Sequence, residues 1–244
     1  MENVGAIILA AGKGKRMKSK KINKVVIPLG NKPMILHTIS LVKSLQIKTI
    51  IAVVGFAKES VMKILDHSVI FAEQKNRLGT AHAVLCALEK LPKNIKVVLV
   101  LNGDDSAFYK RDVIAKLINV HIKNRSSLSF LTINVNNPSG LGRVVRSETG
   151  EVLGIVEDKD ASENQRKIKE INSCYVFDIS FLKRYLKKVR KSPVTGEYYL
   201  TKLIDLAIAN GERVETVKSG KIPWRGINTI EELRQAEKMF LQAR

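Results

Sequence analysis

The sequence has 244 residues, of which 45% are hydrophobic, so it is long enough to bury a core without disulfides or metal ions as cross-links. The 42 Lys and Arg residues against 23 Asp and Glu give a formal net charge of +19. Polyanions are therefore the partners to consider: nucleic acid, nucleotides, phosphosugars or an acidic membrane face. A lysine-rich composition without a function would give the same charge.

Several features indicate a cytoplasmic protein. No apolar stretch is long enough to span a bilayer, and the first residues lack the pattern of a signal peptide. Cys86 and Cys174 are far apart, in apolar surroundings, and no zinc-binding spacing surrounds them. We expect both to be buried free thiols in a reducing compartment.

The first half of the sequence alternates strand-like and helical patterns. Apolar residues recur at helical spacing after Pro33, which a first helical turn accepts, and again after Thr80, which can cap a helix. Such alternation predicts a parallel sheet covered by helices. We expect strands at 5–9, 49–54, 69–72 and 97–101, and helices between them, including one at 80–91.

The second half predicts a mixed sheet that continues the first. We expect strands at 128–135, 144–146, 152–157 and 171–177, and helices at 111–123, 180–189, 199–210 and 230–242. No linker, repeat or low-complexity segment separates the two halves. The sequence therefore predicts one α/β domain over residues 1–244, with a mixed, mostly parallel sheet flanked by helices.

Ligands of an open parallel sheet bind beyond the carboxyl ends of its strands, so the loops after Leu9, Ala72 and Leu101 should contain the site. The first loop is Ala10-Ala11-Gly12-Lys13-Gly14-Lys15-Arg16-Met17. Its glycines let backbone N–H groups approach phosphate oxygens, which the basic side chains neutralise. Met17 stands where both the Walker A and the dinucleotide motif need glycine. Taken alone, such a loop is more often a solvated turn.

The second and third loops add polar groups. The second places the amide of Gln74 near Gly79, at the start of a helix. An amide donates and accepts at once, as the edge of a uracil ring requires, although an ordinary capping loop has the same composition. The third, Asn102-Gly103-Asp104-Asp105, follows an apolar strand, where its acids suit Mg²⁺ or simply form a turn.

With these loops in this order, the sequence resembles the sugar-phosphate nucleotidyltransferases. Within them it is most similar to the uridylyltransferase domain of bifunctional N-acetylglucosamine-1-phosphate uridylyltransferases. The segments around Glu157 and Asn172 are the discriminating ones, because related nucleotidyltransferases share the first loop but not this spacing. Further matching segments are Gly140-Leu141-Gly142-Arg143-Val144, Gly154-Ile155-Val156-Glu157-Asp158-Lys159-Asp160-Ala161, Glu170-Ile171-Asn172, Gly196-Glu197-Tyr198-Tyr199-Leu200-Thr201 and Gly226-Ile227-Asn228.

The resemblance implies a Rossmann-like nucleotide-diphospho-sugar transferase fold, with a nucleotide-binding half at 1–125, a sugar-binding half at 126–228 and a C-terminal helix at 229–244. It implies Arg16 and Lys24 as catalytic cations, and Asp104 and Asn228 as Mg²⁺ ligands. The nucleotide would contact Leu9, Ala10, Ala11, Gly12, Gly14, Gln74, Gly79 and Thr80. The sugar would contact Gly142, Glu157 and Asn172.

The reaction that the resemblance implies joins UTP and N-acetylglucosamine 1-phosphate to give UDP-N-acetylglucosamine and pyrophosphate. The sugar phosphate has a second pKa of about 6, so it is already an oxyanion near neutral pH and needs no general base. Its oxygen attacks the α-phosphorus and expels pyrophosphate. Catalysis is then positioning and charge neutralisation, which fits a sequence whose few histidines are scattered.

The sequence also departs from the family pattern. Asn23 replaces a proline before Lys24, Arg77 replaces a second glutamine, and Asn102 replaces an aromatic residue. Asp105 opens a segment that replaces the usual apolar-Pro-Leu, and it either adds a metal ligand or reshapes the loop. The bifunctional enzymes continue into hexapeptide repeats, whereas this sequence ends at Arg244. We therefore expect neither acetyl transfer nor trimerisation through a β-helix.

Two alternatives remain open at this point. The same chemistry could use another sugar 1-phosphate, such as glucose 1-phosphate, or dTTP. The second alternative is a non-catalytic, basic nucleic-acid-binding protein. Against it, the lysines are spread along the chain rather than clustered with aromatic residues, and only 5% of residues are aromatic. We expect small-molecule substrates, no membrane partner and only weak, sequence-independent nucleic-acid binding. The oligomeric state is not predicted.

Overall fold

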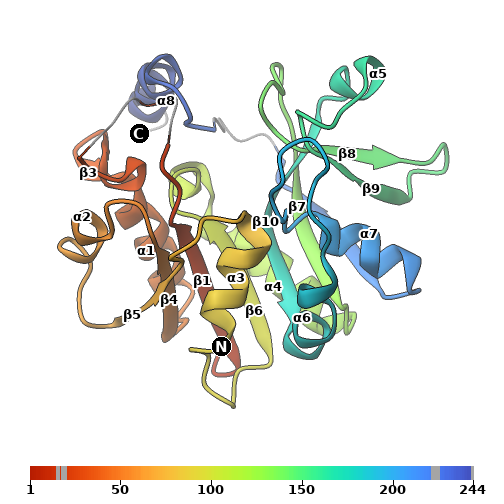
Figure 1. Cartoon of the computed structure of the whole chain (residues 1–244), viewed down its shortest axis with the longest axis horizontal. Coiled ribbons are helices and arrows are strands. Elements are labelled where there is room, and N and C mark those ends of the chain that lie inside the picture. The colour runs from red at the N-terminus through yellow and green to blue at the C-terminus, as the bar shows by residue number, and fades with distance from the viewer. Residues whose placement is uncertain (15–16, 18–20, 221–225, 243–244) are drawn as a thin grey trace.

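The computed structural model describes residues 1–14, 17, 21–220 and 226–242. Within these residues, one sheet runs through both halves of the chain in the order β11-β7-β10-β6-β1-β4-β5, with β8 and β9 attached beside β10 (Figure 1). Its strands are β1 (Val4–Ala10), β4 (Thr49–Val54), β5 (Val69–Glu73), β6 (Val97–Asn102), β7 (Leu128–Asn134), β8 (Arg143–Arg146), β9 (Val152–Val156), β10 (Glu170–Asp178) and β11 (Val214–Lys218).

The sheet is mostly parallel. β1 pairs in parallel with both β4 and β6, so that Leu9 lies beside Val53 on one side and Asn102 on the other. β10 is antiparallel to both β6 and β7, and β11 returns parallel to β7. This confirms the predicted α/β class with a mixed, mostly parallel sheet. The register brings the carboxyl ends of β1, β4, β5 and β6 to one edge.

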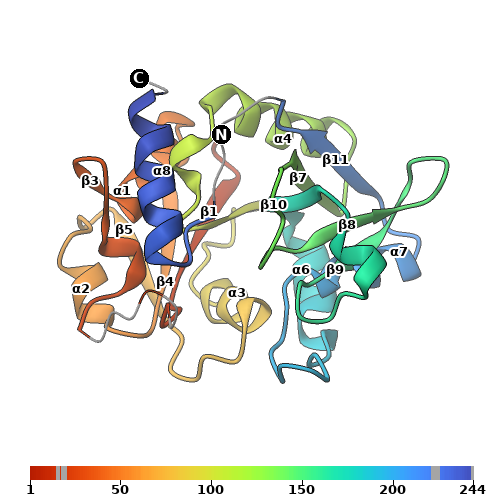
Figure 2. The ribbon, with the colours of Figure 1, turned by 90° about the horizontal axis from the view of Figure 1, so that it is seen from above.

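Helices cover both faces of the sheet, as Figure 2 shows from above. Along β1, Ala6 and Ile8 belong to one core while Ile7 belongs to the other, and all three are buried. Such two-sided burial explains why the strand is apolar throughout. The first core is covered by α1 (Met34–Ser44), α2 (Lys58–Met62), α4 (Arg111–Lys123) and α8 (Ile230–Gln242), and the second by α3 (Thr80–Leu88), α6 (Ile179–Tyr185) and α7 (Lys202–Ala209).

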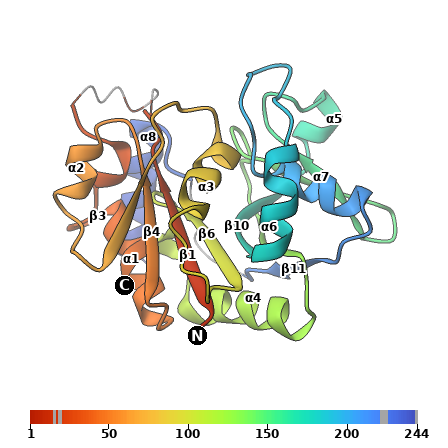
Figure 3. The same cartoon turned by 60° about the horizontal axis from the view of Figure 1, so that its bottom comes forward.

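The outer elements are shorter. Figure 3 shows α3 and α6 on the near face of the sheet, and Figure 1 shows β8, β9 and α5 projecting to one side. The remaining short elements are the 3-10 helices η2 (Lys24–Val26), η3 (Ser106–Phe108) and η4 (Leu186–Lys188), the two-residue strands β2 (Pro28–Leu29) and β3 (Lys32–Pro33), and α5 (Glu163–Arg166).

Most expected elements are present, and the differences have local causes. α7 begins at Lys202 rather than at residue 199, because the preceding backbone bonds to another loop, as described below. β11 was not predicted, since its edge position leaves the alternating Val214–Lys218 segment only partly buried. Cys174 is buried as expected, whereas Cys86 is only half-buried. None of the described helices is long and apolar enough to cross a membrane.

His121 on α4 gives the fold a pH-dependent stability. The side chain is buried, its Nδ1 lies 2.9 Å from Ser129 Oγ, and burial lowers the pKa of His121 to about 4, against a smaller opposing effect of Asp178. The unfolded chain therefore binds a proton more readily than the folded one between pH 6.5 and 4. The free energy of unfolding should fall by about 1 kcal/mol per pH unit as the pH drops through this range.

Urea unfolding between pH 7 and 4.5 measures this effect. His121→Gln is the matched control, because glutamine stays neutral and can still bond to Ser129. The variant should lose less stability than the wild type on acidification. Parallel pH profiles for the two proteins would show that His121 is not the responsible group.

Candidate active site

Two adjoining clefts open at the carboxyl edge of the sheet. We call the first the β1 cleft; it has a volume of about 630 Å³ and lies over the loops that follow β1, β5 and β6. The second, the β10 cleft, has a volume of about 430 Å³ and lies between those loops and the β8–β10 region. Lys24, Asp104 and Asn228 line both clefts. The two spaces therefore meet around these three side chains, together with Leu9, Thr80, Asn102 and Glu197.

The structure brings the predicted site residues together in two groups. The β1 cleft is lined by all of the residues expected around a nucleotide, namely Leu9, Ala10, Ala11, Gly12, Gly14, Gln74, Gly79 and Thr80. The β10 cleft is lined by Gly142, Glu157 and Asn172, the residues expected around a sugar. Arg16, the other expected catalytic cation, lies outside the described residues.

Lys24 is the centre of the junction. Its ammonium forms an ion pair with Asp104 and donates to Ile227 O at 2.9 Å and to Asn228 Oδ1 at 3.2 Å. The side chains of Lys24 and Asp104 are only 13% and 16% exposed, so water screens their attraction less than at an open surface. Oxygens from two distant parts of the chain thus converge on one cation.

Each of these oxygens is held by its own segment. Asp104 follows β6, where Gly103 N donates to Leu9 O at 3.0 Å and fixes the end of β6 against β1. Asn228 precedes α8, whose start is a capping box: Glu232 N donates to Thr229 Oγ1, and Thr229 N donates to Glu232 Oε2. Asn228 N also donates to Glu232 Oε2, so the cap of α8 positions the asparagine.

Gln74 differs in one respect from the expectation that its amide both donates and accepts toward a base. Nε2 donates to Gly79 O at 2.9 Å and lies 3.0 Å from His82 Nδ1. The Nε2 donor of Gln74 is therefore used inside the protein, where its bond to Gly79 O stabilises the loop after β5. Among the described residues no hydrogen bond involves Oε1, so the acceptor is the group that Gln74 offers to the cleft.

The segment at 196–201 is hydrogen-bonded to the loop after β5 and to the start of α3. Tyr198 N donates to Leu78 O at 2.8 Å, and Ala81 N donates to Tyr198 O at 2.9 Å. Thr80 does not cap its own helix, as its sequence position suggested; Gly79 is the N-cap, and Thr80 Oγ1 accepts from Leu200 N. The sequence contained this segment as a matching motif, but nothing in it indicated these bonds.

The β10 cleft contains a half-buried carboxyl group, that of Glu157. Thr201 Oγ1 donates to Glu157 Oε1 at 2.8 Å, and burial raises the pKa of Glu157 above its usual range, with a smaller contribution from Asp160. Nearby, the amide of Asn172 bonds to the hydroxyl of Tyr175, while its buried Oδ1 has no hydrogen-bond partner among the described residues. Tyr175 lines this cleft and was missed, because a tyrosine in a strand is usually a core residue.

Asp105 is also part of the site. It is buried, Asn102 Nδ2 donates to its Oδ2 at 2.9 Å, and Ser106 Oγ donates to its Oδ1 at 3.3 Å. Burial and the neighbouring Asp104 raise the pKa of Asp105 well above the usual carboxyl range. Because both oxygens accept bonds from its own loop, Asp105 shapes the turn after β6.

The junction fits a hard cation. The Asp104 carboxylate, the Asn228 amide oxygen and a backbone carbonyl already converge on the positive charge of Lys24, and such oxygens are the ligands that a hard cation prefers. The described residues contain no cluster of three or more His, Cys, Asp or Glu that could hold a metal ion. Asp104 and Asn228 would therefore complete the coordination of a metal with phosphate or water oxygens.

An open sheet with helices on both faces and a cleft at the carboxyl ends of its strands is the arrangement in which α/β proteins bind nucleotides and similar ligands. The family model for nucleotidyl transferases matches residues 5–243. The chain therefore belongs to the nucleotidyl transferase family.

Two curated relatives of the chain are bifunctional proteins. The chain is 40% identical over 241 residues to the bifunctional protein GlmU of Caldanaerobacter subterraneus, covering 98% of this chain and 52% of that protein. It is 43% identical over 235 residues to GlmU of Caldicellulosiruptor saccharolyticus, covering 95% of this chain and 50% of that protein. The chain thus spans about half the length of the curated relatives that it matches.

The fold has a counterpart among solved structures. A Bacillus anthracis chain described as a glucose-1-phosphate thymidylyltransferase, crystallised with sucrose, superposes with a TM-score of 0.81. The match covers 97% of this chain and 95% of that chain at 21% sequence identity. It supports the Rossmann-like fold of the family.

Gly79 is the position where the site tolerates a side chain least. Its φ is +112°, and an added Cβ would lie 2.5 Å from Tyr198 O and 2.7 Å from Tyr198 N. Gly79→Ala should therefore destabilise the protein by about 3 kcal/mol or more, through backbone strain and displacement of the 196–201 segment. Urea unfolding measures the loss.

Gly150→Ala is the matched control, because Gly150 has a φ of +88° with nothing within 4 Å of an added Cβ. It should cost only the strain of a left-handed alanine, about 1 kcal/mol. Equal losses in the two variants would mean that the contact with Tyr198 is unimportant.

Proposed function

We propose that the chain is a Mg²⁺-dependent uridylyltransferase that forms UDP-N-acetylglucosamine and pyrophosphate from UTP and N-acetylglucosamine 1-phosphate. The main support is the meeting of the β1 and β10 clefts at Lys24, Asp104 and Asn228, in a chain of the nucleotidyl transferase family. The GlmU relatives support the choice of substrates, because the similarity extends over almost the whole of this chain.

In this proposal the β1 cleft binds UTP and the β10 cleft binds the sugar phosphate. Residues 1–125 then form the nucleotide-binding half and residues 126–228 the sugar-binding half, with 229–244 as the C-terminal helix. The triphosphate would lie over the loop after β1, and the two substrates would approach each other at the junction. The sugar phosphate oxygen attacks the α-phosphorus there, and pyrophosphate leaves toward the β1 cleft.

The cations of the site neutralise the charge that this reaction brings together. Asp104 and Asn228 would hold Mg²⁺, which when bound polarises phosphate oxygens and offsets their negative charge. Lys24, whose ammonium lies against the same two side chains, supplies a second positive charge at the junction. Lys13, Arg77 and Lys159 also line the β1 cleft, as a triphosphate site requires.

Base and sugar choice rest on polar groups deeper in each cleft. The Gln74 acceptor would take the N3–H of uracil, and cytosine lacks a hydrogen at that position. Glu157 and Asn172 would contact sugar hydroxyl or amide groups, with Gly142 leaving room beside them. An added Cβ at Gly142 would lie 2.5 Å from Asn172 Oδ1, so the glycine is required for this arrangement.

Release of pyrophosphate from a panel of sugar 1-phosphates and nucleotides tests the proposal. UTP with N-acetylglucosamine 1-phosphate should give the highest kcat/KM. A preference for glucose 1-phosphate or dTTP would favour the sibling activity suggested by the thymidylyltransferase fold. Absence of turnover with every pair, together with nucleic-acid binding that persists at physiological salt, would favour the binding-protein alternative.

Asp104→Asn should lower kcat about 100-fold or more, because the amide cannot balance the charge of Mg²⁺ at the junction. EDTA should abolish turnover of the wild type, and added Mg²⁺ should restore it. Circular dichroism and thermal unfolding check that the variant is folded. Near-normal kcat in folded Asp104→Asn would exclude this metal site.

Asp105→Asn is the matched comparison, since asparagine keeps the shape of a buried carboxyl group that already bonds within its loop. Its kcat should change much less than that of Asp104→Asn. A larger loss at Asp105 would place the metal ligand one residue later.

Gln74→Ala should raise the KM for UTP and reduce the preference for UTP over CTP by about tenfold, because the uracil N3–H loses an acceptor worth roughly 1–3 kcal/mol. Gln74→Glu is the control. It keeps an acceptor but loses the donor to Gly79 O, so it should disturb the loop while retaining most of the base preference. Unchanged UTP/CTP ratios in Gln74→Ala would exclude base reading by this residue.

A further inference from the structure

Asn23 is a fully buried polar residue immediately before Lys24. Its side chain forms hydrogen bonds to distant residues in addition to the one that caps η2. It is the N-cap of η2, where its Oδ1 accepts from Val25 N at 3.1 Å. Its backbone N donates to Ser60 Oγ at 3.0 Å. The residue is 0% exposed, so each of these groups depends on protein partners.

The amide nitrogen of Asn23 binds three backbone carbonyls. Nδ2 donates its two hydrogens to Ala10 O and Phe56 O, each at 2.8 Å, and Gly12 O shares one of them at a longer 3.3 Å. Ala10 is the last residue of β1 and Gly12 belongs to the loop that follows it, while Phe56 belongs to the loop after β4. Carbonyl oxygens repel one another, so their convergence depends on the donor between them.

The loop after β1 also touches the residue next to Asn23. Gly14 has a φ of +58°, and an added Cβ there would lie 3.0 Å from Lys24 Cβ. The loop therefore packs against Asn23 through its carbonyls and against Lys24 through Gly14. Gly12, Lys13 and Gly14 of this loop line the β1 cleft, so an anion in the cleft would lie against the backbone of the loop.

We propose that Asn23 is a positioning residue that fixes the loop after β1 relative to Lys24, so that the N–H groups of the loop and the Lys24 ammonium contact the same triphosphate. The inference rests on the proposed function, because it assigns the β1 cleft to a nucleotide. It concerns this chain in particular, since the family pattern has a proline at this position, and proline has no side-chain donor.

Asn23→Ser is the sharpest test. Serine is a good N-cap and can still accept from Val25 N, but its hydroxyl is too short to replace the amide between the three carbonyls. The Kd of Mg²⁺-UTP, measured by isothermal titration calorimetry, should rise about tenfold or more, which corresponds to about 1.4 kcal/mol. The KM for the sugar 1-phosphate should stay within about twofold, because none of the residues to which the Asn23 side chain is hydrogen-bonded lines the β10 cleft.

Two further variants separate positioning from folding and charge. Ser60→Ala removes the bond to the Asn23 backbone and leaves the amide in place, so its Kd for UTP should match the wild type. Asn23→Asp keeps the shape and the acceptor but replaces the donor by a second oxygen, and should weaken UTP binding at least as much as serine does. If Asn23→Ser does not fold, Asn23→Thr, which is also an N-cap residue without an amide and fills more of the buried space, gives the same comparison.

The outcomes distinguish this inference from the proposed function. Unchanged UTP affinity in folded Asn23→Ser, or equal losses for UTP and sugar phosphate, would show a purely structural role and overturn the inference. Wild-type protein that binds UTP without releasing pyrophosphate would overturn the proposed reaction, while the UTP affinities would still decide the role of Asn23. Wild-type protein that does not bind UTP would overturn both.

Discussion

The ion pair of Lys24 with Asp104 is the contact on which the site depends. It joins η2, which follows the first loop, to the end of β6, and the bonds of Lys24 to Ile227 O and Asn228 Oδ1 bring the segment before α8 to the same point. Because this pair is mostly shielded from water, it holds its partners more firmly than a surface ion pair would. The place where the two clefts meet is thus held together by the contacts of one charged group, the Lys24 ammonium.

The segment at 196–201 adds a second connection between the clefts. Tyr198 and Leu200 bond to the loop after β5, on the side of the β1 cleft, while Thr201 bonds to Glu157 in the β10 cleft. A shift of this segment would move groups in both clefts together. The segment thus contacts both clefts through hydrogen bonds of three neighbouring residues.

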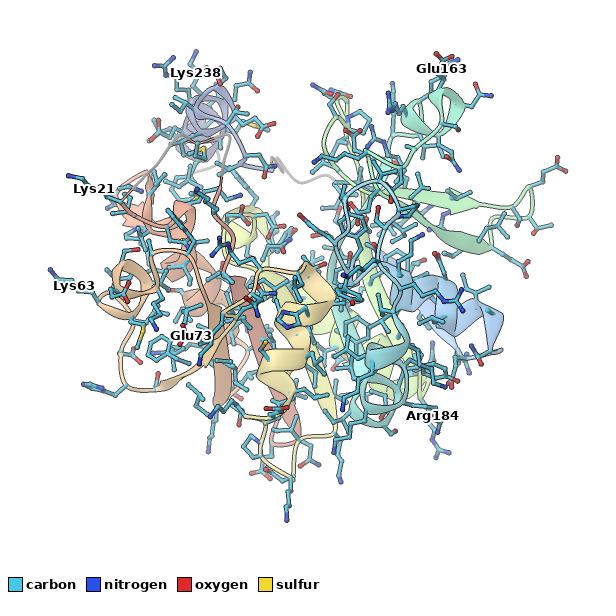
Figure 4. The ribbon with its side chains drawn as sticks, viewed as in Figure 1. Lys21, Lys63, Glu73, Glu163, Arg184 and Lys238 are labelled. Atoms are coloured by element: carbon cyan, nitrogen blue, oxygen red, sulfur yellow. The ribbon has the colours of Figure 1, made fainter. Side chains whose placement is uncertain are left out.

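The high net charge is distributed over the surface. In Figure 4 the labelled Lys63, Arg184 and Lys238 project outward from separate parts of the molecule, and all three are exposed. A smaller set of cations lines the β1 cleft, where Lys13, Arg77 and Lys159 surround the space above the first loop. The surface charge favours approach of any anion, whereas the lining cations favour binding at one place.

Residue patterns alone predicted the class of the fold and most of its elements, because a strand buried on both faces and an amphipathic helix each leave a local signature. They also located the three loops, since a parallel sheet presents the ends of its strands together. Contacts between residues far apart in sequence could not be predicted. Asn23 was recognised only as a departure from a family pattern, yet its amide joins Ala10, Gly12 and Phe56.

The same limit applies to Gln74 and Thr80. The sequence suggested that the Gln74 amide would both donate to and accept from a base, and that Thr80 would cap its helix. The folded chain directs the Gln74 donor to Gly79 O and the Thr80 hydroxyl to Leu200 N. Sequence determined which polar groups are available, because that depends on residue type. Tertiary structure decided which of them are used inside the protein and which face a ligand, because buried donors and acceptors must find partners wherever the chain brings them.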